Sequence, residues 1–139
     1  MSVLYQATGV AIGGRAVLIT GAAGSGKSSL ALALIDRGAR LIGDDGVLLE
    51  VAGDHLLASP APHTAGLLEV RNVGIVTRPT LSRVTVALVL HLDAKAPRFV
   101  DAAEQTQIEG IGLPLIRLWP NSPVLHLRAE LALERHGLG

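Results

Sequence analysis

The chain has 139 residues, of which 49% are hydrophobic, so we expect a single packed domain over residues 1–139 rather than a disordered chain. Basic and acidic side chains balance to a net charge of zero and only 2% of the residues are aromatic, which argues against a nucleic-acid-binding surface. There is no cysteine, which excludes disulfides and thiolate metal sites.

The sequence shows no signal for membrane insertion or secretion. The strongly apolar segment Val84–Leu90 is far too short to span a bilayer. The first residues lack the basic stretch followed by an apolar segment that is typical of a secretory signal. We therefore expect a cytoplasmic protein that binds neither nucleic acid nor membranes.

The first part of the chain predicts short strands. Residues 3–5 and 10–12 are compatible with extended structure, and Gly13-Gly14 is typical of a turn. Ala16–Thr20 then predicts a compact buried strand, because an apolar run of this length bounded by glycines is typical of one.

A helix is predicted over Ser28–Arg37. Leu30, Ala33 and Leu34 would share one face of it, as expected for a helix that packs against a sheet. Gly38 stands where a glycine commonly ends a helix.

The middle of the chain predicts further strands with one hairpin. Ala52-Gly53-Asp54 is a hairpin turn signal between two apolar runs, and the two prolines in Ser59–His63 indicate a loop. The expected extended segments are Arg40–Ile42, Val47–Val51, His55–Ala58, Leu67–Arg71 and Gly74–Val76.

The last part of the chain combines a long strand with a terminal helix. Val84–Leu92 is the strongest strand, Ala94–Glu109 predicts a mobile loop region, and Leu115–Leu118 a short strand. Pro123–His136 predicts an amphipathic helix. The order of elements predicts an α/β fold with a mixed sheet, a helix after residue 27 and a C-terminal helix.

Residues 21–28 match the phosphate-binding loop pattern G-x-x-x-x-G-K-[ST] in full, between a predicted strand and a predicted helix. In this pattern backbone N–H groups and the helix N-terminus hold phosphate, the lysine reaches the terminal phosphates, and the serine hydroxyl can complete a magnesium shell. The alternative is an ordinary glycine-rich turn. The expected phosphate-binding residues are Gly21, Ala22, Ala23, Gly24, Ser25, Gly26, Lys27, Ser28 and Ser29.

A phosphate loop requires acidic partners, and two sets compete. Asp93 ends the strongest strand, as a generic metal-binding aspartate of such proteins would. Asp44-Asp45 follows the strand after the loop helix, where one carboxylate could hold magnesium and the other accept a proton. From residue types alone, the pair could equally be turn residues between Gly43 and Gly46.

Three features together resemble the catalytic domain of the HPr kinase/phosphorylase family. They are the phosphate loop, the strand ending in Asp44-Asp45, and the signature-like segment Leu67–Ile75. The resemblance extends over residues 5 to about 93 and implies one of the short, single-domain bacterial versions. It implies a P-loop kinase core of the HPr kinase/phosphoenolpyruvate carboxykinase type, with ATP and Mg²⁺ as cofactors and an HPr-like phosphocarrier protein as partner.

The family resemblance also implies roles for individual residues. Asp44 would be the general base toward the target serine and Asp45 would support it. Ser28 and Glu69 would bind the metal. Arg98 is the candidate for a mobile basic residue that reaches the transferring phosphoryl group. The implied activity is an ATP-dependent serine kinase, with the reverse phosphorylase reaction as an option, and the implied assembly is a homo-oligomer, specifically a hexamer.

The chain departs from the family pattern in two places. Gln6 or Thr8 stands where the family has a histidine, and Pro120–Pro123 replaces a glycine-arginine-asparagine turn. Two alternatives therefore remain, namely a catalytically weakened nucleotide-binding regulatory domain and a P-loop kinase for a small molecule. The histidines share no ligand spacing, and we expect His91 to be a packed or hydrogen-bonded residue of the central strand.

Overall fold

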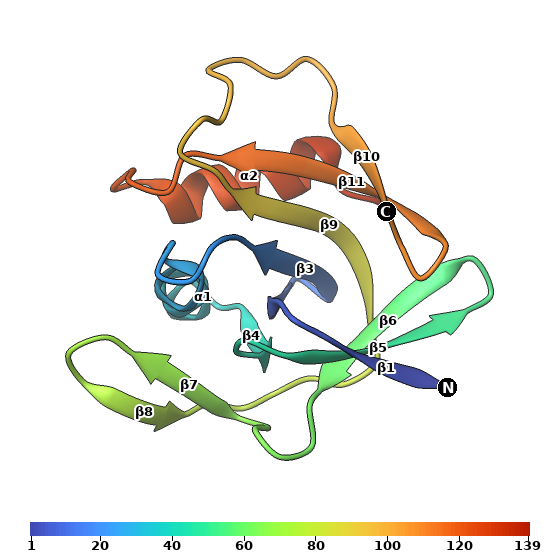
Figure 1. Ribbon diagram of the computed structural model, residues 1–139, viewed down its shortest axis with the longest axis vertical. Coiled ribbons are helices and arrows are strands. Elements are labelled where there is room, and N and C mark those ends of the chain that lie inside the picture. Colours follow the sequence, from blue (N-terminus) through green and yellow to red (C-terminus); the bar gives the residue numbers. More distant parts are fainter.

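The computed structural model describes residues 1–139, and it contains eleven strands and two helices (Figure 1). The helices are α1 (Lys27–Asp36) and α2 (Leu125–His136). The strands are β1 (Ser2–Tyr5), β2 (Thr8–Ile12), β3 (Arg15–Thr20), β4 (Arg40–Gly43), β5 (Val47–Ala52), β6 (His55–Pro60), β7 (Leu67–Val70), β8 (Gly74–Thr77), β9 (Val84–Leu92), β10 (Glu104–Ile108) and β11 (Ile111–Leu118). None of the helices is long and apolar enough to cross a membrane.

One mixed sheet of nine strands organises the molecule, in the order β1-β5-β6-β9-β3-β2-β4, and β11 pairs with both β9 and β10. The strands β3, β9 and β11 are parallel to one another. β2 is antiparallel to both β3 and β4, so β4 runs in the same direction as β3. The carboxyl ends of these four parallel-running strands therefore lie at one edge of the sheet, which is where α/β proteins place their ligands.

The two faces of the sheet carry separate apolar clusters. On one face α1 and α2 pack through side chains such as Leu34 and Leu133 against Leu90 of β9. On the other face β5 and β6 cover the same strands, with Leu49 and Leu18 in the second cluster. Because β9 is covered on both faces, seven of its nine residues are buried, and a simple alternation of apolar and polar positions is absent.

The helix after the phosphate loop ends as the sequence predicts. Gly38 adopts a φ of 108°, its N–H donates to Ile35 O at 3.0 Å, and Ala39 N donates to Leu34 O at 3.0 Å. This is the bond pattern of a Schellman motif, in which a glycine takes the left-handed conformation after the last helical turn. The motif returns the chain directly into β4.

β7 and β8 form a separate two-stranded sheet that projects beyond the main one (Figure 1). Leu68 is fully buried, whereas Leu67 and Ile75 on the other side of the hairpin are exposed. β7 packs on α1 through its buried side. The hairpin therefore stands beside the helix that follows the phosphate loop.

The predicted α/β fold with a mixed sheet, a loop helix and a C-terminal helix is confirmed, but several boundaries were wrong. β6 continues to Pro60, which pairs with Val47, although prolines indicated a loop from Ser59. The region Ala94–Glu109 contains β10, a mostly polar strand paired with β11 alone.

Three further boundaries shifted. β11 begins at Ile111 rather than Leu115, and Pro114 lies inside it as the partner of Gln105. The prediction started too late because a proline usually argues against a strand. The C-terminal helix begins at Leu125, two residues after the predicted start at Pro123. β7 ends at Val70, one residue before the predicted end.

Candidate active site

The phosphate loop leaves β3 at Thr20 and enters α1 at Lys27. Gly24 and Gly26 have φ values of 78° and 104°, a backbone region that residues with side chains rarely adopt. Leu30 N donates to Gly26 O at 2.9 Å, so the helical hydrogen bonds start at the end of the loop. The free N–H groups and positive dipole end of α1 therefore face the loop, as an anion-binding site requires.

Lys27 lies across the loop. Its Nζ donates to the carbonyl oxygens of Gly21 and Ala22, each at 3.0 Å. A Cβ on Gly21 would come within 2.7 Å of Ser25 Oγ, and within 3.3 Å of the carbonyl oxygen of Leu92 on β9. Glycine is thus required at the first loop position because the loop packs directly against the end of the neighbouring strand.

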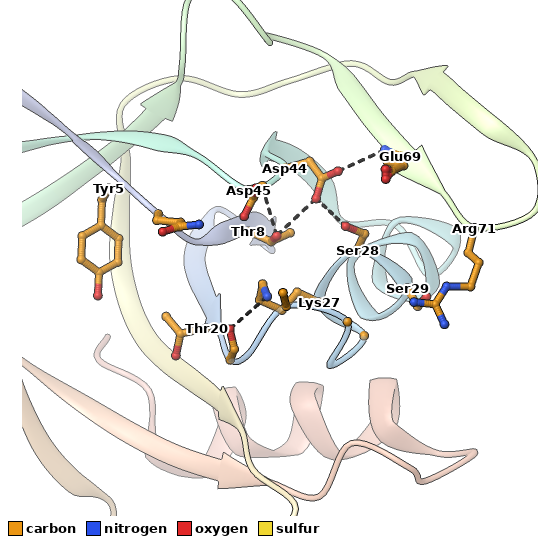
Figure 2. A pocket seen from close by; sticks show the side chains of 15 residues that line it. Tyr5, Thr8, Thr20, Lys27, Ser28, Ser29, Asp44, Asp45, Glu69 and Arg71 are labelled. Carbon is orange, nitrogen blue, oxygen red and sulfur yellow. Dashed lines mark hydrogen bonds between the residues drawn. The ribbon is translucent and has the colours of Figure 1, made fainter.

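The aspartate pair lies opposite the loop, directly after β4 (Figure 2). Asp44 Oδ1 accepts hydrogen bonds from Ser28 Oγ at 2.6 Å and from Thr8 Oγ1 at 3.3 Å. Asp44 Oδ2 accepts one from the Glu69 backbone N–H at 3.0 Å. The Asp44 carboxylate is therefore held by β2, the start of α1 and β7 at once.

Asp45 differs from its neighbour in conformation and exposure. Its φ is 59°, in the left-handed region, and its N–H donates to Thr8 Oγ1 at 3.2 Å. Its side chain is exposed, and its carboxylate accepts no hydrogen bond. Fully buried Thr8 thus orients both aspartates, since its hydroxyl donates to one and accepts from the other.

A cavity of about 800 Å³ lies between the loop, the aspartate pair and β7 (Figure 2). Nearly all of its lining is polar or glycine, which suits a highly charged ligand better than an apolar one. The lining residues are Tyr5, Gln6, Thr8, Thr20, Gly21, Ala23, Gly24, Gly26, Lys27, Ser28, Ser29, Asp44, Asp45, Glu69 and Arg71.

The cavity brings together most of the residues expected from the sequence. Ala22 and Ser25 belong to the loop but do not line the cavity, and Ser25 Oγ is buried without a hydrogen-bond partner. Arg98 is exposed on the chain between β9 and β10 and lies outside the cavity. Its proposed contact with the transferring group therefore stays a prediction.

Asp93 is engaged elsewhere. Its carboxylate accepts hydrogen bonds from Lys95 N at 2.8 Å and from Arg117 Nη1 at 3.1 Å. The pKa of Asp93 is lowered from its ordinary value, first by the Lys95 backbone hydrogen bond and then by Arg117. Because Asp93 does not line the cavity, the geometry favours Asp44-Asp45 as the acidic partner of the loop.

Four lining residues received no chemical role from the sequence. They are Tyr5, Thr20, Arg71 and Thr8, which supports the aspartate pair. Thr20 carried a usable signal, because it is the one polar residue at the end of an apolar strand, immediately before the phosphate loop. His91, expected to be packed or hydrogen-bonded, is confirmed as such, since its Nδ1 lies 2.8 Å from Thr20 Oγ1.

The sequence comparison supports this geometry. A profile of the family described as the HPr Serine kinase C-terminal domain matches residues 2–81, which contain the loop, the aspartate pair and the β7–β8 hairpin. The chain belongs to this family. The part of the chain that matches the family includes the phosphate loop, Asp44-Asp45 and Glu69.

Two curated HPr kinase/phosphorylases illustrate the similarity. The protein from Clostridium tetani is 40% identical over 87 residues, covering 58% of this chain and 28% of that protein. The protein from Limosilactobacillus reuteri is 35% identical over 120 residues, covering 77% of this chain and 38% of that protein. The chain thus spans well under half the length of these curated relatives.

A solved structure gives the same result for the fold. The HPr(Ser) kinase/phosphatase from Coxiella burnetii superposes with a TM-score of 0.84 at 30% identity, over 95% of this chain and 94% of that one. The likeness includes β10, β11 and α2, which lie beyond the matched residues 2–81. The fold of this HPr kinase family member is therefore shared over almost its whole length.

Proposed function

We propose that residues 1–139 form one kinase domain that transfers the γ-phosphoryl group of ATP to a serine of an HPr-like phosphocarrier protein. The observation that carries this proposal is the 2.6 Å hydrogen bond from Ser28 Oγ to Asp44 Oδ1, which places the end of the phosphate loop beside the aspartate pair. Phosphoryl transfer needs that combination, because a bound phosphate must meet both a metal and a group that accepts the hydroxyl proton.

The residues around Ser28 fit a magnesium ion. Magnesium binds oxygen and usually takes only one or two carboxylates, the remaining positions being filled by water and substrate phosphates. The structure contains no group of three or more His, Asp or Glu side chains arranged to hold a metal, so water and phosphate oxygens would have to supply most of the ligands. Ser28 would hold the ion with Glu69, and its chemistry would be to neutralise charge on the phosphates.

Proton transfer is assigned to Asp44. The serine hydroxyl of the substrate would lose its proton to a carboxylate oxygen of Asp44 while its oxygen bonds to the γ-phosphorus and the bond to the β-phosphate oxygen breaks. Lys27 and the loop N–H groups would hold the phosphates, and Asp45 would support the site. In the phosphorylase reaction the phosphoryl group of phosphoserine would pass to an oxygen of inorganic phosphate, forming pyrophosphate, while Asp44 returns a proton to the departing serine oxygen.

One observation favours a second assignment of the base. Asp44 already accepts three hydrogen bonds, whereas the exposed carboxylate of Asp45 accepts none. A base needs a free lone pair within reach of the proton it takes. Asp45 is thus the alternative base, with Asp44 then serving to hold the loop and the metal.

A regulatory domain with weakened catalysis is the second candidate function. It is supported by Gln6, which lines the cavity but cannot take up a proton near neutral pH, and by the position of Arg98 outside the cavity. Such a domain would bind nucleotide and transfer phosphate slowly or not at all. We further propose that the protein acts in the cytoplasm and as a homo-oligomer, in keeping with the family resemblance.

Phosphate transfer from labelled ATP to a purified HPr-like protein tests the proposal. We expect phosphoserine on the carrier with the wild-type chain, and loss of both ATP binding and transfer in Lys27→Ala with the fold retained. ATP binding without transfer would favour the regulatory domain. Transfer to a small molecule but not to the carrier would favour a small-molecule kinase, and unchanged ATP affinity in a folded Lys27→Ala protein would overturn the nucleotide site itself.

A further inference from the structure

A polar row crosses the carboxyl ends of the three parallel strands. Thr20 of β3 is the register partner of His91 of β9, and His91 is the register partner of Arg117 of β11. Register partners point to the same face of a sheet. The first residue of this row, Thr20, lines the cavity and directly precedes the phosphate loop (Figure 2).

The two residues nearest the cavity are joined by a hydrogen bond of 2.8 Å between Thr20 Oγ1 and His91 Nδ1, and both are half-buried. A threonine hydroxyl has one hydrogen to donate and lone pairs to accept with. If Nδ1 of His91 carries no hydrogen, the Thr20 hydroxyl donates to it and offers only lone pairs to the cavity. If Nδ1 carries a hydrogen, as in the neutral Nδ1–H tautomer and in the imidazolium, it donates to the hydroxyl, whose hydrogen is then free to point into the cavity.

These two states differ in their interaction with phosphate. Phosphate oxygens accept hydrogen bonds and do not donate when fully ionised, so a hydroxyl that offers only lone pairs repels them. A hydroxyl that offers its hydrogen makes a charge-assisted bond, which is among the stronger kinds of hydrogen bond. A phosphate oxygen beside Thr20 therefore favours a hydrogen on Nδ1 of His91. Of the neutral tautomers only one carries this hydrogen, whereas the imidazolium always does. Protonation of His91 thus favours the phosphate, and the phosphate favours protonation by the same amount.

We propose that His91 is a positioning residue that sets the direction of the Thr20 hydroxyl and thereby couples nucleotide binding to proton uptake. This inference rests on the proposed function only in taking the ligand to be a nucleoside triphosphate. The imidazole itself does not line the cavity, and it acts through Thr20.

Charged groups surround His91 on two neighbouring elements. Asp93 lies two positions after His91, just beyond the end of β9, and its pKa is lowered by the Lys95 N–H, by Arg117 and, to a smaller extent, by His91. Arg117 lies on β11, and its positive charge disfavours a second positive charge on His91. Two carboxylates offset this charge, because Arg117 is bound to Glu104 of β10 at 2.8 Å and to Asp93 at 3.1 Å.

Lys27 and Tyr5 of β1 are the titratable side chains on the Thr20 side of the cavity (Figure 2). The Lys27 ammonium is bound to the carbonyl oxygens of Gly21 and Ala22, each at 3.0 Å.

The test is calorimetric titration of the folded chain with ATP across about pH 5.5 to 8, the range in which histidine titrates. Each titration is repeated in buffers of different ionisation enthalpy, so that protons taken up on binding are counted. We expect the wild type to bind more tightly as the pH falls, relative to His91→Asn, and to take up a proton that His91→Asn does not. The asparagine amide retains a hydrogen-bonding atom near the place of Nδ1 but cannot titrate.

Comparison between the two proteins removes the titration of ATP itself, which is common to both. His126→Asn provides the matched control, because His126 is half-buried on α2 and outside the cavity, and it should match the wild type at every pH. Thr20→Val should weaken binding about ten-fold at low pH and abolish the proton uptake. Thr20→Ser keeps the hydroxyl and should therefore keep both the ATP affinity at low pH and the proton uptake. A purely structural role of Thr20 would not predict this.

Each result decides something. Identical pH profiles for the wild type and His91→Asn would overturn the inference, as would full ATP affinity and proton uptake in Thr20→Val. The inference stands if ATP binds with the expected profile but no phosphate reaches a carrier protein, in which case only the proposed function fails. Failure of the wild type to bind ATP at any pH would overturn both.

Discussion

The Ser28 hydroxyl donates a 2.6 Å hydrogen bond to Asp44 Oδ1, across a sequence separation of 16 residues. One partner ends the phosphate loop at the start of α1, and the other follows β4. The Schellman turn at Gly38 and the antiparallel pairing of β2 with β4 bring these two segments back to the same edge of the sheet. The loop and the carboxylate are therefore positioned by the fold rather than by a ligand.

Asp44→Asn should retain ATP binding and lose transfer by about two to four orders of magnitude, the range by which proton-transfer groups contribute. The amide keeps the size of the side chain but cannot accept the serine proton. Transfer rates and calorimetric ATP affinities are measured side by side for Asp44→Asn, Asp45→Asn and Asp93→Asn. A larger loss in Asp45→Asn would move the base to Asp45, and a larger loss in Asp93→Asn would reject the pair as the acidic partner.

Gly43→Ala should destabilise the protein and impair phosphate transfer. A Cβ at this position would lie 2.2 Å from Gly46 O and 3.0 Å from Val47 Cγ1, so the turn that carries both aspartates must shift. Overpacking of this kind costs about 1–3 kcal/mol in free energy of unfolding. Urea denaturation and the transfer assay report the two effects.

Gly46→Ala is the matched control for that turn. Its Cβ would meet only Leu4 Cδ1, at an ordinary contact distance of 3.8 Å, and its φ is not in the left-handed region. We expect it to fold and transfer phosphate as the wild type does. Equal destabilisation by the two alanines would show that the close approach at Gly43 is not what matters.

Arg117→Met should alter the acid dependence of stability. The pKa of Asp93 lies below its ordinary value of 3.8, because the Lys95 N–H and Arg117 favour the carboxylate. A carboxyl group whose pKa is lowered by folding stabilises the protein above its unfolded pKa, and this stabilisation is lost as the pH falls through the folded pKa. The difference in stability between wild type and variant should therefore be small, present at neutral pH, and shrink below about pH 4.

Urea denaturation between pH 2 and pH 7 measures this difference. Arg128→Met alters an exposed arginine on α2 that does not contact Asp93, so it controls for the general effect of removing a positive charge. A gap between wild type and Arg117→Met that stays constant down to pH 2 would contradict the assignment of the shift to Arg117.

Gln6→His should raise turnover and add a titration near the ordinary histidine value of about 6.5 to the pH–rate profile. Gln6 lines the cavity together with both aspartates, so a histidine there could take up the proton that a glutamine cannot. The initial rate of transfer as a function of pH provides the measurement. A wild-type rate of about 1–100 per second, with Gln6→His neutral, would show that Gln6 has no part in the chemistry.

Sequence reasoning succeeded where the determinants are local. The loop at residues 21–28, the helix stop at Gly38 and the hairpin at Gly53 each depend on neighbouring residues, and the structure has all three. The family resemblance proposed Glu69 as a metal ligand, but nothing in the sequence predicts that its backbone N–H binds the Asp44 carboxylate.

The features that escaped prediction depend on pairing between distant strands. Thr8 orients both aspartates only because β2 lies between β3 and β4 in the sheet. Likewise Thr20 meets His91 through the register of β3 with β9. No hairpin turn joins β3 to β9, so no turn in the sequence fixes their register.

The β7–β8 hairpin shares no strand pairing with the main sheet, and the Glu69 N–H to Asp44 bond is a direct link from its backbone to the aspartate pair. Segments held by few contacts open locally at a lower free energy than the whole molecule, and their amide protons exchange with solvent sooner. Hydrogen exchange at Glu69 should thus be faster than in β3 or β9. The exchange rate of the Glu69 amide would therefore report how often its hydrogen bond to Asp44 opens, without any assay of catalysis.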